Sequence, residues 1–304
     1  MSNQTDSCIF CKDAKINVLV PKDAIPCKVA VLKCSQCGLV FLESRGNADQ
    51  EDREERLYWE GDQKKVYLQE KVQKVFCDEF ARRLESLHRY GKSSGALLDV
   101  GCGVGHFLDK ARDKGFSVKG LDISPVAAEA AKEKYNIEVN VGTLESAPYA
   151  SDSFDVVALW DVIEHIRRPL ENMKAINKII KKGGILVMKT PNEDSLFKWI
   201  ARFAYAVLGH RGAFLLKYVY YVPHYFAYSK KTMDLLLKNF GFEVIAYELD
   251  QTPTEFGAEK INVHYRKDSK RSIIIALLPL VQFMARLLGR QNKLVVYARK
   301  VKTV

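Results

Sequence analysis

The chain lacks the features of a secretory signal. Its first seven residues are polar, with neither a basic start nor an apolar run, so we expect a cytoplasmic protein in which disulfides are rare. No internal repeat or low-complexity tract is present, which excludes a repeat architecture. With 304 residues and 47% hydrophobic content, the chain can bury the core of one medium domain and add a small module.

Acidic residues are scarce in the C-terminal third. Residues 195–304 hold 7 Asp and Glu against 18 Lys and Arg, whereas residues 1–194 hold 30 against 29. We therefore expect an anionic partner near this end. Two apolar stretches here are too short or too interrupted to span a bilayer, but they suit interfacial helices. The first interpretation is a lid and a packing helix; the alternative is peripheral contact with the inner face of the membrane through 195–222 and 273–290. The basic residues that edge them are Lys198, Arg202, Lys217, Arg286 and Arg290.

Four of the seven cysteines fall in two pairs with metal-ligand spacing. The pairs are separated by 22 residues, and each has two residues between its cysteines. In a reducing compartment this pattern favours tetrahedral zinc over disulfides. We predict a structural zinc ribbon over residues 1–45, followed by an acidic linker over 46–63. Its metal ligands are Cys8, Cys11, Cys34 and Cys37.

The rest of the chain, residues 64–304, alternates β-type runs with helical patterns after a first helix at 64–90. This alternation predicts an α/β fold, a Rossmann-like, mostly parallel sheet of seven strands with helices on both faces. A lid insertion is expected at 195–228 and a second insertion at 251–292, in which the polar segment 257–265 is expected to be mobile. We expect strands at 97–100, 117–121, 137–141, 154–159, 185–189, 242–249 and 294–299, and further helices at 104–114, 125–135, 169–182 and 230–240.

A glycine-rich segment follows the first of these strands. Asp99 precedes Gly101-x-Gly103-x-Gly105, a side-chain-free turn that lets backbone N–H groups approach a nucleotide-type ligand. Asp122 ends the next strand, where an acidic residue accepts from ribose hydroxyls. A nicotinamide site needs G-x-G-x-x-G, but His106 occupies the position of its third glycine.

At this point the sequence resembles the class I S-adenosylmethionine-dependent methyltransferases, over about residues 67–301. Their motifs recur in order, at 97–105, 122, 142–145, 152–157, 161–166 and 182–187. The resemblance places methionine on the glycine loop, ribose on Asp122, and adenine against Ile123 and Leu144. Many members have Asp where this chain has Thr143, so the adenine acceptor is unassigned. The expected cofactor-binding residues are Asp99, Gly101, Cys102, Gly103, Gly105, Asp122, Ile123, Thr143, Leu144, Trp160 and Asp161.

Methyl transfer from a sulfonium needs alignment, exclusion of water and, for a hydroxyl acceptor, a base. His165 and His224 are the candidate catalytic bases, and a structural histidine is the alternative for each. Asp161, Glu164 and His165 also resemble the acid-x-x-Glu-His cluster of ubiquinone-pathway O-methyltransferases, which is linked to magnesium. In most relatives this segment serves the fold, so magnesium is the secondary hypothesis.

Zinc ribbons precede methyltransferase domains in bacterial and archaeal proteins that resemble modifiers of sugars, glycans or small molecules. The first hypothesis is therefore methyl transfer to a small-molecule, sugar or lipid-linked acceptor, at oxygen. One alternative is an RNA or protein methyltransferase that uses the ribbon to bind its substrate. The ribbon lacks a basic excess, so nucleic acid is not expected. Another alternative is a non-catalytic, membrane-associated adaptor.

Overall fold

The computed structural model describes residues 7–25, 28–43, 70–220, 224–265 and 268–304. The predicted linker at 46–63 and the start of the predicted helix at 64–90 lie outside these residues. The chain divides into two units, each assembled from discontinuous segments. The cysteine unit comprises Met1–Gly46, Thr190–Met233 and Glu248–Val295; the sheet unit comprises Asn47–Lys189, Asp234–Tyr247 and Val296–Val304.

A seven-stranded sheet has the order β10-β11-β8-β7-β4-β5-β6. Neighbours pair in parallel from β8 through β7, β4 and β5 to β6. Its central strands are mostly buried and apolar, as expected for a sheet covered on both faces. The predicted Rossmann-like fold is therefore confirmed. The strands are β4 (Gly95–Val100), β5 (Phe116–Asp122), β6 (Val139–Val141), β7 (Phe154–Trp160), β8 (Ile180–Pro191), β10 (Phe242–Asp250) and β11 (Lys293–Lys300).

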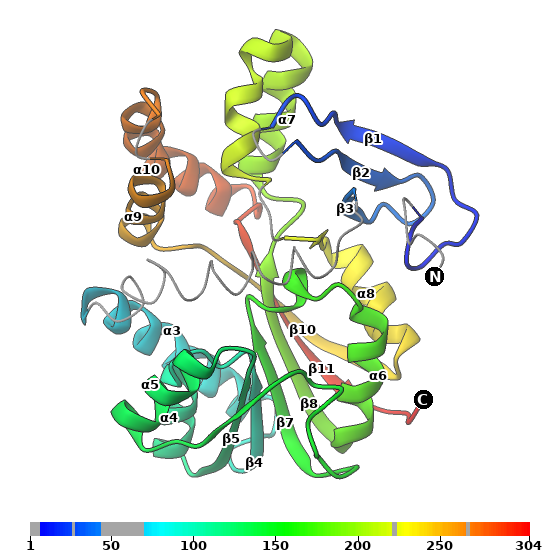
Figure 1. The fold of residues 1–304 in the computed structure, drawn as a ribbon, viewed down its shortest axis with the longest axis vertical. Coiled ribbons are helices and arrows are strands. Elements are labelled where there is room, and N and C mark those ends of the chain that lie inside the picture. Colours follow the sequence, from blue (N-terminus) through cyan, green and yellow to red (C-terminus); the bar gives the residue numbers. More distant parts are fainter. Residues whose placement is uncertain (1–6, 26–27, 44–69, 221–223, 266–267) are drawn as a thin grey trace. The chain divides into compact units, whose positions relative to one another are not determined.

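Helices lie on both faces of this sheet, with α3, α4 and α5 on one and α6 and α8 on the other (Figure 1). Helix α5 illustrates why they begin and end where they do. The Ser124 hydroxyl accepts from Ala127 N at 3.2 Å, Pro125 opens the helix, and Asn136 ends it in a left-handed conformation. The bounds are α3 (Glu70–Arg89), α4 (His106–Asp113), α5 (Pro125–Tyr135), α6 (Pro169–Ile179) and α8 (Lys230–Asn239).

One predicted boundary is wrong. The helix expected over 169–182 ends at Ile179, and β8 begins at once with Ile180 instead of at residue 185. Ile180 pairs with Phe154 of β7, and the register then shifts before Val156 pairs with Ile185. Strand pairing thus extends past the two glycines that local sequence assigns to a turn; Gly183 takes a φ of 76°.

In the cysteine unit, β1 (Ile16–Val20), β2 (Val31–Cys34), β3 (Val40–Leu42) and β9 (Phe226–Ala227) form an antiparallel sheet in that order. The N-terminal strands share one apolar core with the segment that follows β8. Val20, Val31 and Val40 pack with Ala201 and Leu216. The expected ribbon and the expected lid segment therefore fold together.

Three helices and two 3-10 turns complete the cysteine unit. They are α7 (Leu196–Leu208), η3 (Gly209–Arg211), η4 (Ala213–Tyr218), α9 (Thr254–His264) and α10 (Arg271–Leu287). Residues 257–264 of the segment expected to be mobile lie in α9, which packs against α10, and Tyr265 caps that helix; its mobility stays a prediction. Among the described residues, no helix has the length and apolar character needed to cross a bilayer.

Candidate functional site

Three glycines form the turn between β4 and α4 in the sheet unit. Gly101, Gly103 and Gly105 have φ angles of 69°, 53° and 83°, which favour glycine. A Cβ on Gly101 would lie 2.5 Å from Val162 Cγ2, so packing alone requires glycine there. A Cβ on Gly103 would meet no atom of the described residues within 4 Å. The backbone beside Gly103 is therefore open to a ligand.

The Asp122 carboxylate lies beside this turn at the end of β5. Its Oδ2 accepts from Gly103 N at 2.7 Å and its Oδ1 accepts from Ser124 N at 2.9 Å. Burial raises the pKa of Asp122, and these backbone donors oppose that shift. Each carboxylate oxygen has a second lone pair, so Asp122 can also accept from two hydroxyl groups.

Asp99 is a buried carboxyl group inside the sheet. It lies on β4, next to Gly120 of β5 and Ala158 of β7, and is 1% exposed. Among the described residues, its Oδ1 has no hydrogen-bond partner. Burial raises the pKa of Asp99 well above its usual range, and the charge of Asp122 adds to the shift. The pair Asp99 and Asp122 thus suits a ligand that brings hydroxyls and a cationic group.

The end of β7 presents Trp160 and Asp161. The Trp160 ring packs between Phe80 and Phe107, with ring centroids 5.6 Å and 4.9 Å away. Within the described residues, its buried Nε1 has no acceptor. Asp161 has a positive φ of 57°, and its backbone N donates to Lys189 O at 2.8 Å. This backbone conformation fixes the direction of Asp161.

Two residues that the sequence analysis missed hold Asp161 in place. Lys189 Nζ lies 3.1 Å from Asp161 Oδ2 and 2.8 Å from Glu79 Oε1 of α3. Burial alone would lower the pKa of Lys189, but the charges of Asp161 and Glu79 raise it above its usual range. Lys189 is the one charge at the end of the apolar run 185–188, and a buried cation needs partners. That signal was present in the sequence.

The other expected cofactor contacts lie on loops at the same edge of the sheet. Cys102 is buried behind the glycine turn, and burial raises its pKa well above its usual range. Ile123 is half-buried after β5 and Leu144 is buried after β6. Thr143 is exposed, and its N–H donates to Ser146 Oγ at 3.1 Å. The structure therefore places Cys102, Ile123, Thr143 and Leu144 after strands that neighbour one another.

The two candidate bases belong to different units. His165 ends the short turn η2 (Ile163–His165) of the sheet unit and is half-buried. His224 precedes β9 in the cysteine unit and is also half-buried. Magnesium at the acid-x-x-Glu-His segment stays a prediction: Asp161 there faces the Lys189 ammonium, and Glu164 is 1% exposed.

The four paired cysteines converge in the cysteine unit. Their Sγ atoms all lie within 4.8 Å of one another. Backbone N–H groups donate to three of the sulfurs: Phe10 to Cys8 at 3.4 Å, Cys37 to Cys34 at 3.5 Å, and Leu39 to Cys37 at 3.5 Å. Such donors favour thiolate, the form that binds metal.

The thiols differ in acidity. Burial raises the pKa of Cys8 above its usual range and that of Cys11 to about 11. For Cys34 burial acts in the same direction, but the N–H groups of Cys37 and Gln36 outweigh it and lower the pKa to about 7. Four sulfurs at these separations, with backbone donors to three, fit a tetrahedral divalent cation.

Comparisons with known proteins agree with this geometry. Residues 68–247 match the family described as "Methyltransferase domain". A ubiquinone biosynthesis O-methyltransferase of Cereibacter sphaeroides is 31% identical over 118 residues, 37% of this chain and 46% of that protein. The mitochondrial ubiquinone biosynthesis O-methyltransferase of Schizosaccharomyces pombe is 29% identical over 139 residues, which are 43% of this chain and 49% of that protein. The chain therefore spans about half the length of these curated relatives.

Solved structures show the same fold at lower identity. A SAM dependent methyltransferase from Archaeoglobus fulgidus is 19% identical, with a TM-score of 0.50 over 74% of this chain and 94% of that chain. The family match covers more than half of this chain. The chain belongs to the methyltransferase domain family, and its sheet is the Rossmann-like fold of the class I S-adenosylmethionine-dependent enzymes. The match begins at residue 68, after the cysteine pairs.

Proposed function

We propose that the protein transfers a methyl group from S-adenosylmethionine to an oxygen of a small-molecule, sugar or lipid-linked acceptor. The glycine turn carries this proposal, because Gly103 presents open backbone directly beside Asp122, whose oxygens have free lone pairs. When bound, the cofactor supplies a sulfonium-activated methyl group. The names of the curated relatives support an oxygen target.

The residues of the sheet unit take distinct parts in this proposal. Asp122 accepts from the ribose hydroxyls, and the peptide groups of Gly101 to Gly105 contact the methionine portion. Asp99 faces the cationic part of the ligand with an oxygen that has no partner within the described residues. Ile123 and Leu144 pack against the adenine, with Cys102 and Thr143 beside them. Trp160 and the fixed Asp161 border the methyl group.

The chemistry at the acceptor needs one proton acceptor. As the methyl carbon bonds to the acceptor oxygen, its bond to sulfur breaks and the hydroxyl proton must leave. We propose that His165 or His224 takes this proton. Replacing each histidine by Ala distinguishes them: loss of the base lowers kcat by about a hundredfold or more and leaves cofactor affinity unchanged.

The four cysteines are proposed to hold one structural zinc ion, which takes no part in methyl transfer. Three N–H···S contacts and the mutual approach of the sulfurs support this assignment. A reduced thiolate site is compatible with the cytoplasm. Metal analysis of the purified chain tests the assignment: zinc should be retained through gel filtration, and iron in its place, or no metal, would contradict it.

An assay of S-adenosylhomocysteine release tests the main proposal. The panel contains a catechol, nucleotide sugars, a polyprenyl-linked sugar and bulk RNA, and cofactor binding is measured by calorimetry on the same preparation. Turnover with one of the hydroxyl acceptors is expected. Binding with turnover on RNA alone would overturn the small-molecule assignment, and absence of cofactor binding would overturn the proposal that the protein is an enzyme.

The predicted peripheral membrane contact through 195–222 and 273–290 is part of the same proposal.

A further inference from the structure

Helix α10 exposes a continuous apolar stripe. Ile273, Leu277, Leu280, Met284 and Leu287 follow one another at spacings of four and three residues and are 40% to 65% exposed. Residues at this spacing lie on one side of a helix. The buried side of α10 holds Leu278, Ala285 and Gln282, whose amide donates to Thr252 O at 2.9 Å. Burial in its own unit therefore accounts for only one side of the helix.

Helix α7 has a second stripe of the same kind. Trp199, Phe203 and Val207 recur every four residues and are 46% to 64% exposed. The Trp199 and Phe203 rings stack on each other with centroids 5.4 Å apart. α7 and α10 pack against each other within the cysteine unit (Figure 1). Monomeric proteins rarely expose this much clustered apolar surface without a partner.

Basic residues are the charged residues of the two helix segments themselves. Residues 195–222 and 269–292 contain no Asp or Glu. Cations stand at the helix ends: Arg211 follows α7, Lys270 and Arg271 open α10, and Arg286 and Arg290 close it. An apolar face bounded by cations suits the boundary between anionic headgroups and acyl chains.

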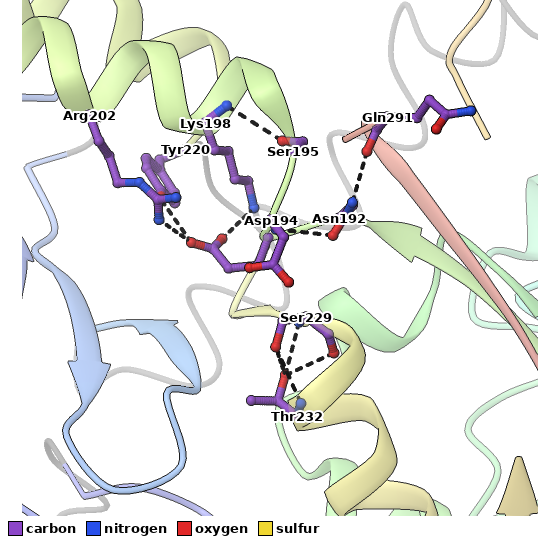
Figure 2. Close-up of polar contacts among 10 residues, drawn as sticks. Asn192, Asp194, Ser195, Lys198, Arg202, Tyr220, Ser229, Thr232 and Gln291 are labelled. Carbon is purple, nitrogen blue, oxygen red and sulfur yellow. Dashed lines mark hydrogen bonds and ion pairs between the residues drawn. The ribbon is translucent and has the colours of Figure 1, made fainter. Parts of the chain in front are cut away.

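Two basic residues of α7 that were expected to border its exposed face point into the unit instead. Figure 2 shows Lys198, Arg202 and Tyr220 converging inside the unit. Lys198 Nζ lies 2.8 Å from Glu193 Oε2, and Arg202 pairs with the same carboxylate. Lys198 is 6% exposed, so its ammonium group pairs inside the unit and does not add charge to the surface. The exposed stripe of α7 is therefore uncharged, and its cations are those at the ends.

We propose that the exposed faces of α7 and α10 form a docking surface for an anionic lipid bilayer, on which both helices lie in the plane of the interface. This rests on the proposed function, because it gives a lipid-linked acceptor a route from the bilayer to the enzyme. A second copy of the chain is the competing occupant. Charge disfavours it, since 195–222 and 269–292 carry basic residues and no Asp or Glu, and two copies of such a surface repel each other.

Flotation of the full chain with vesicles tests this surface. Phosphatidylcholine vesicles are compared with vesicles that also contain phosphatidylglycerol, in the absence of S-adenosylmethionine. The chain should float with the anionic vesicles, less so at high salt. Leu280→Glu should weaken binding by about tenfold or more, because it replaces a large exposed apolar side chain that would enter the bilayer with a charge.

Val18→Glu is the matched control, because Val18 is equally apolar and 63% exposed but lies on β1. It should float like the unmodified chain. A chain that never floats, or equal loss in both variants, would overturn the proposal. So would a dimer in light scattering that Leu280→Glu dissociates without any vesicle binding. Calorimetry with S-adenosylmethionine on the same variants shows separately whether the proposed function holds.

Discussion

The buried carboxyl group of Asp99 should destabilise the ligand-free protein when it is ionised. Asp99→Asn keeps the side-chain shape and removes the charge. The group is 1% exposed, its Oδ1 has no partner within the described residues, and Asp122 repels its charge. Leaving such a group unpaired costs about 1–3 kcal/mol, more when it is ionised. Asn leaves the position polar but uncharged, so at alkaline pH the ligand-free variant should be more stable by about 1.4 kcal/mol for each pH unit by which folding raises the pKa of Asp99.

The pH dependence gives this prediction its sign. Because the pKa of Asp99 is raised in the folded state, that state holds its proton to higher pH than the unfolded chain does. Stability of the unmodified protein should then fall as pH rises through the folded-state pKa, and Asp99→Asn should lack this slope. The gain from the substitution is thus largest at alkaline pH.

Urea denaturation of both proteins at several pH values, without ligand, measures the difference. Calorimetry should show the opposite effect on binding: the variant should bind S-adenosylmethionine at least about tenfold more weakly, since a charge-assisted hydrogen bond is lost. A variant that is destabilised at every pH, or that binds S-adenosylmethionine with unchanged affinity, would refute the assignment of Asp99 as the carboxylate that pairs with the cationic part of the ligand.

Three further substitutions test the buried ion pair of Lys189, the four-cysteine cluster and the turn at Gly241. Lys189→Met leaves buried Glu79 with the longer contact to Arg83 at 3.6 Å and should cost about 3 kcal/mol in urea denaturation, the lower end for a broken buried pair; a cost under about 1 kcal/mol would contradict a stabilising role for Lys189. Cys34→Ser should lower bound zinc from about one ion per chain in metal analysis, and full retention would contradict the four-sulfur site. Gly241→Ala places a Cβ 2.2 Å from Lys302 O at a φ of 74°, so its thermal midpoint should fall, and an unchanged midpoint would dispute this close approach.

The strand and helix pattern of the sheet unit was predictable because each element carries its own periodicity. The glycine turn was equally readable, since positive φ angles at Gly101, Gly103 and Gly105 demand glycine and leave a mark in the sequence. Helix α5 was placed correctly because Pro125 and the residue before it signal the start. Local rules sufficed wherever the cause of the structure was local.

Long-range pairing was not predictable in this way. Strand β9 is two residues long and exists because Phe226 and Ala227 pair with β3. The start of β8 at Ile180 depends on its partner Phe154. Glu79 and Lys189 meet across 110 positions of sequence, so neither residue alone reveals the other. Assembly of the cysteine unit from three separate segments has the same origin.

Calorimetric titration of S-adenosylmethionine into the unmodified chain and into Gly103→Ala tests the central claim most directly. A Cβ at Gly103 meets nothing within 4 Å in the part of the chain that the structure describes, so the fold should survive the strain of about 1–2 kcal/mol. The unmodified chain should bind one cofactor, and the variant should bind at least about tenfold more weakly because its methyl group occupies the open backbone face. Equal affinity in both, or no binding to the unmodified chain, would contradict the assignment of this turn as the cofactor site.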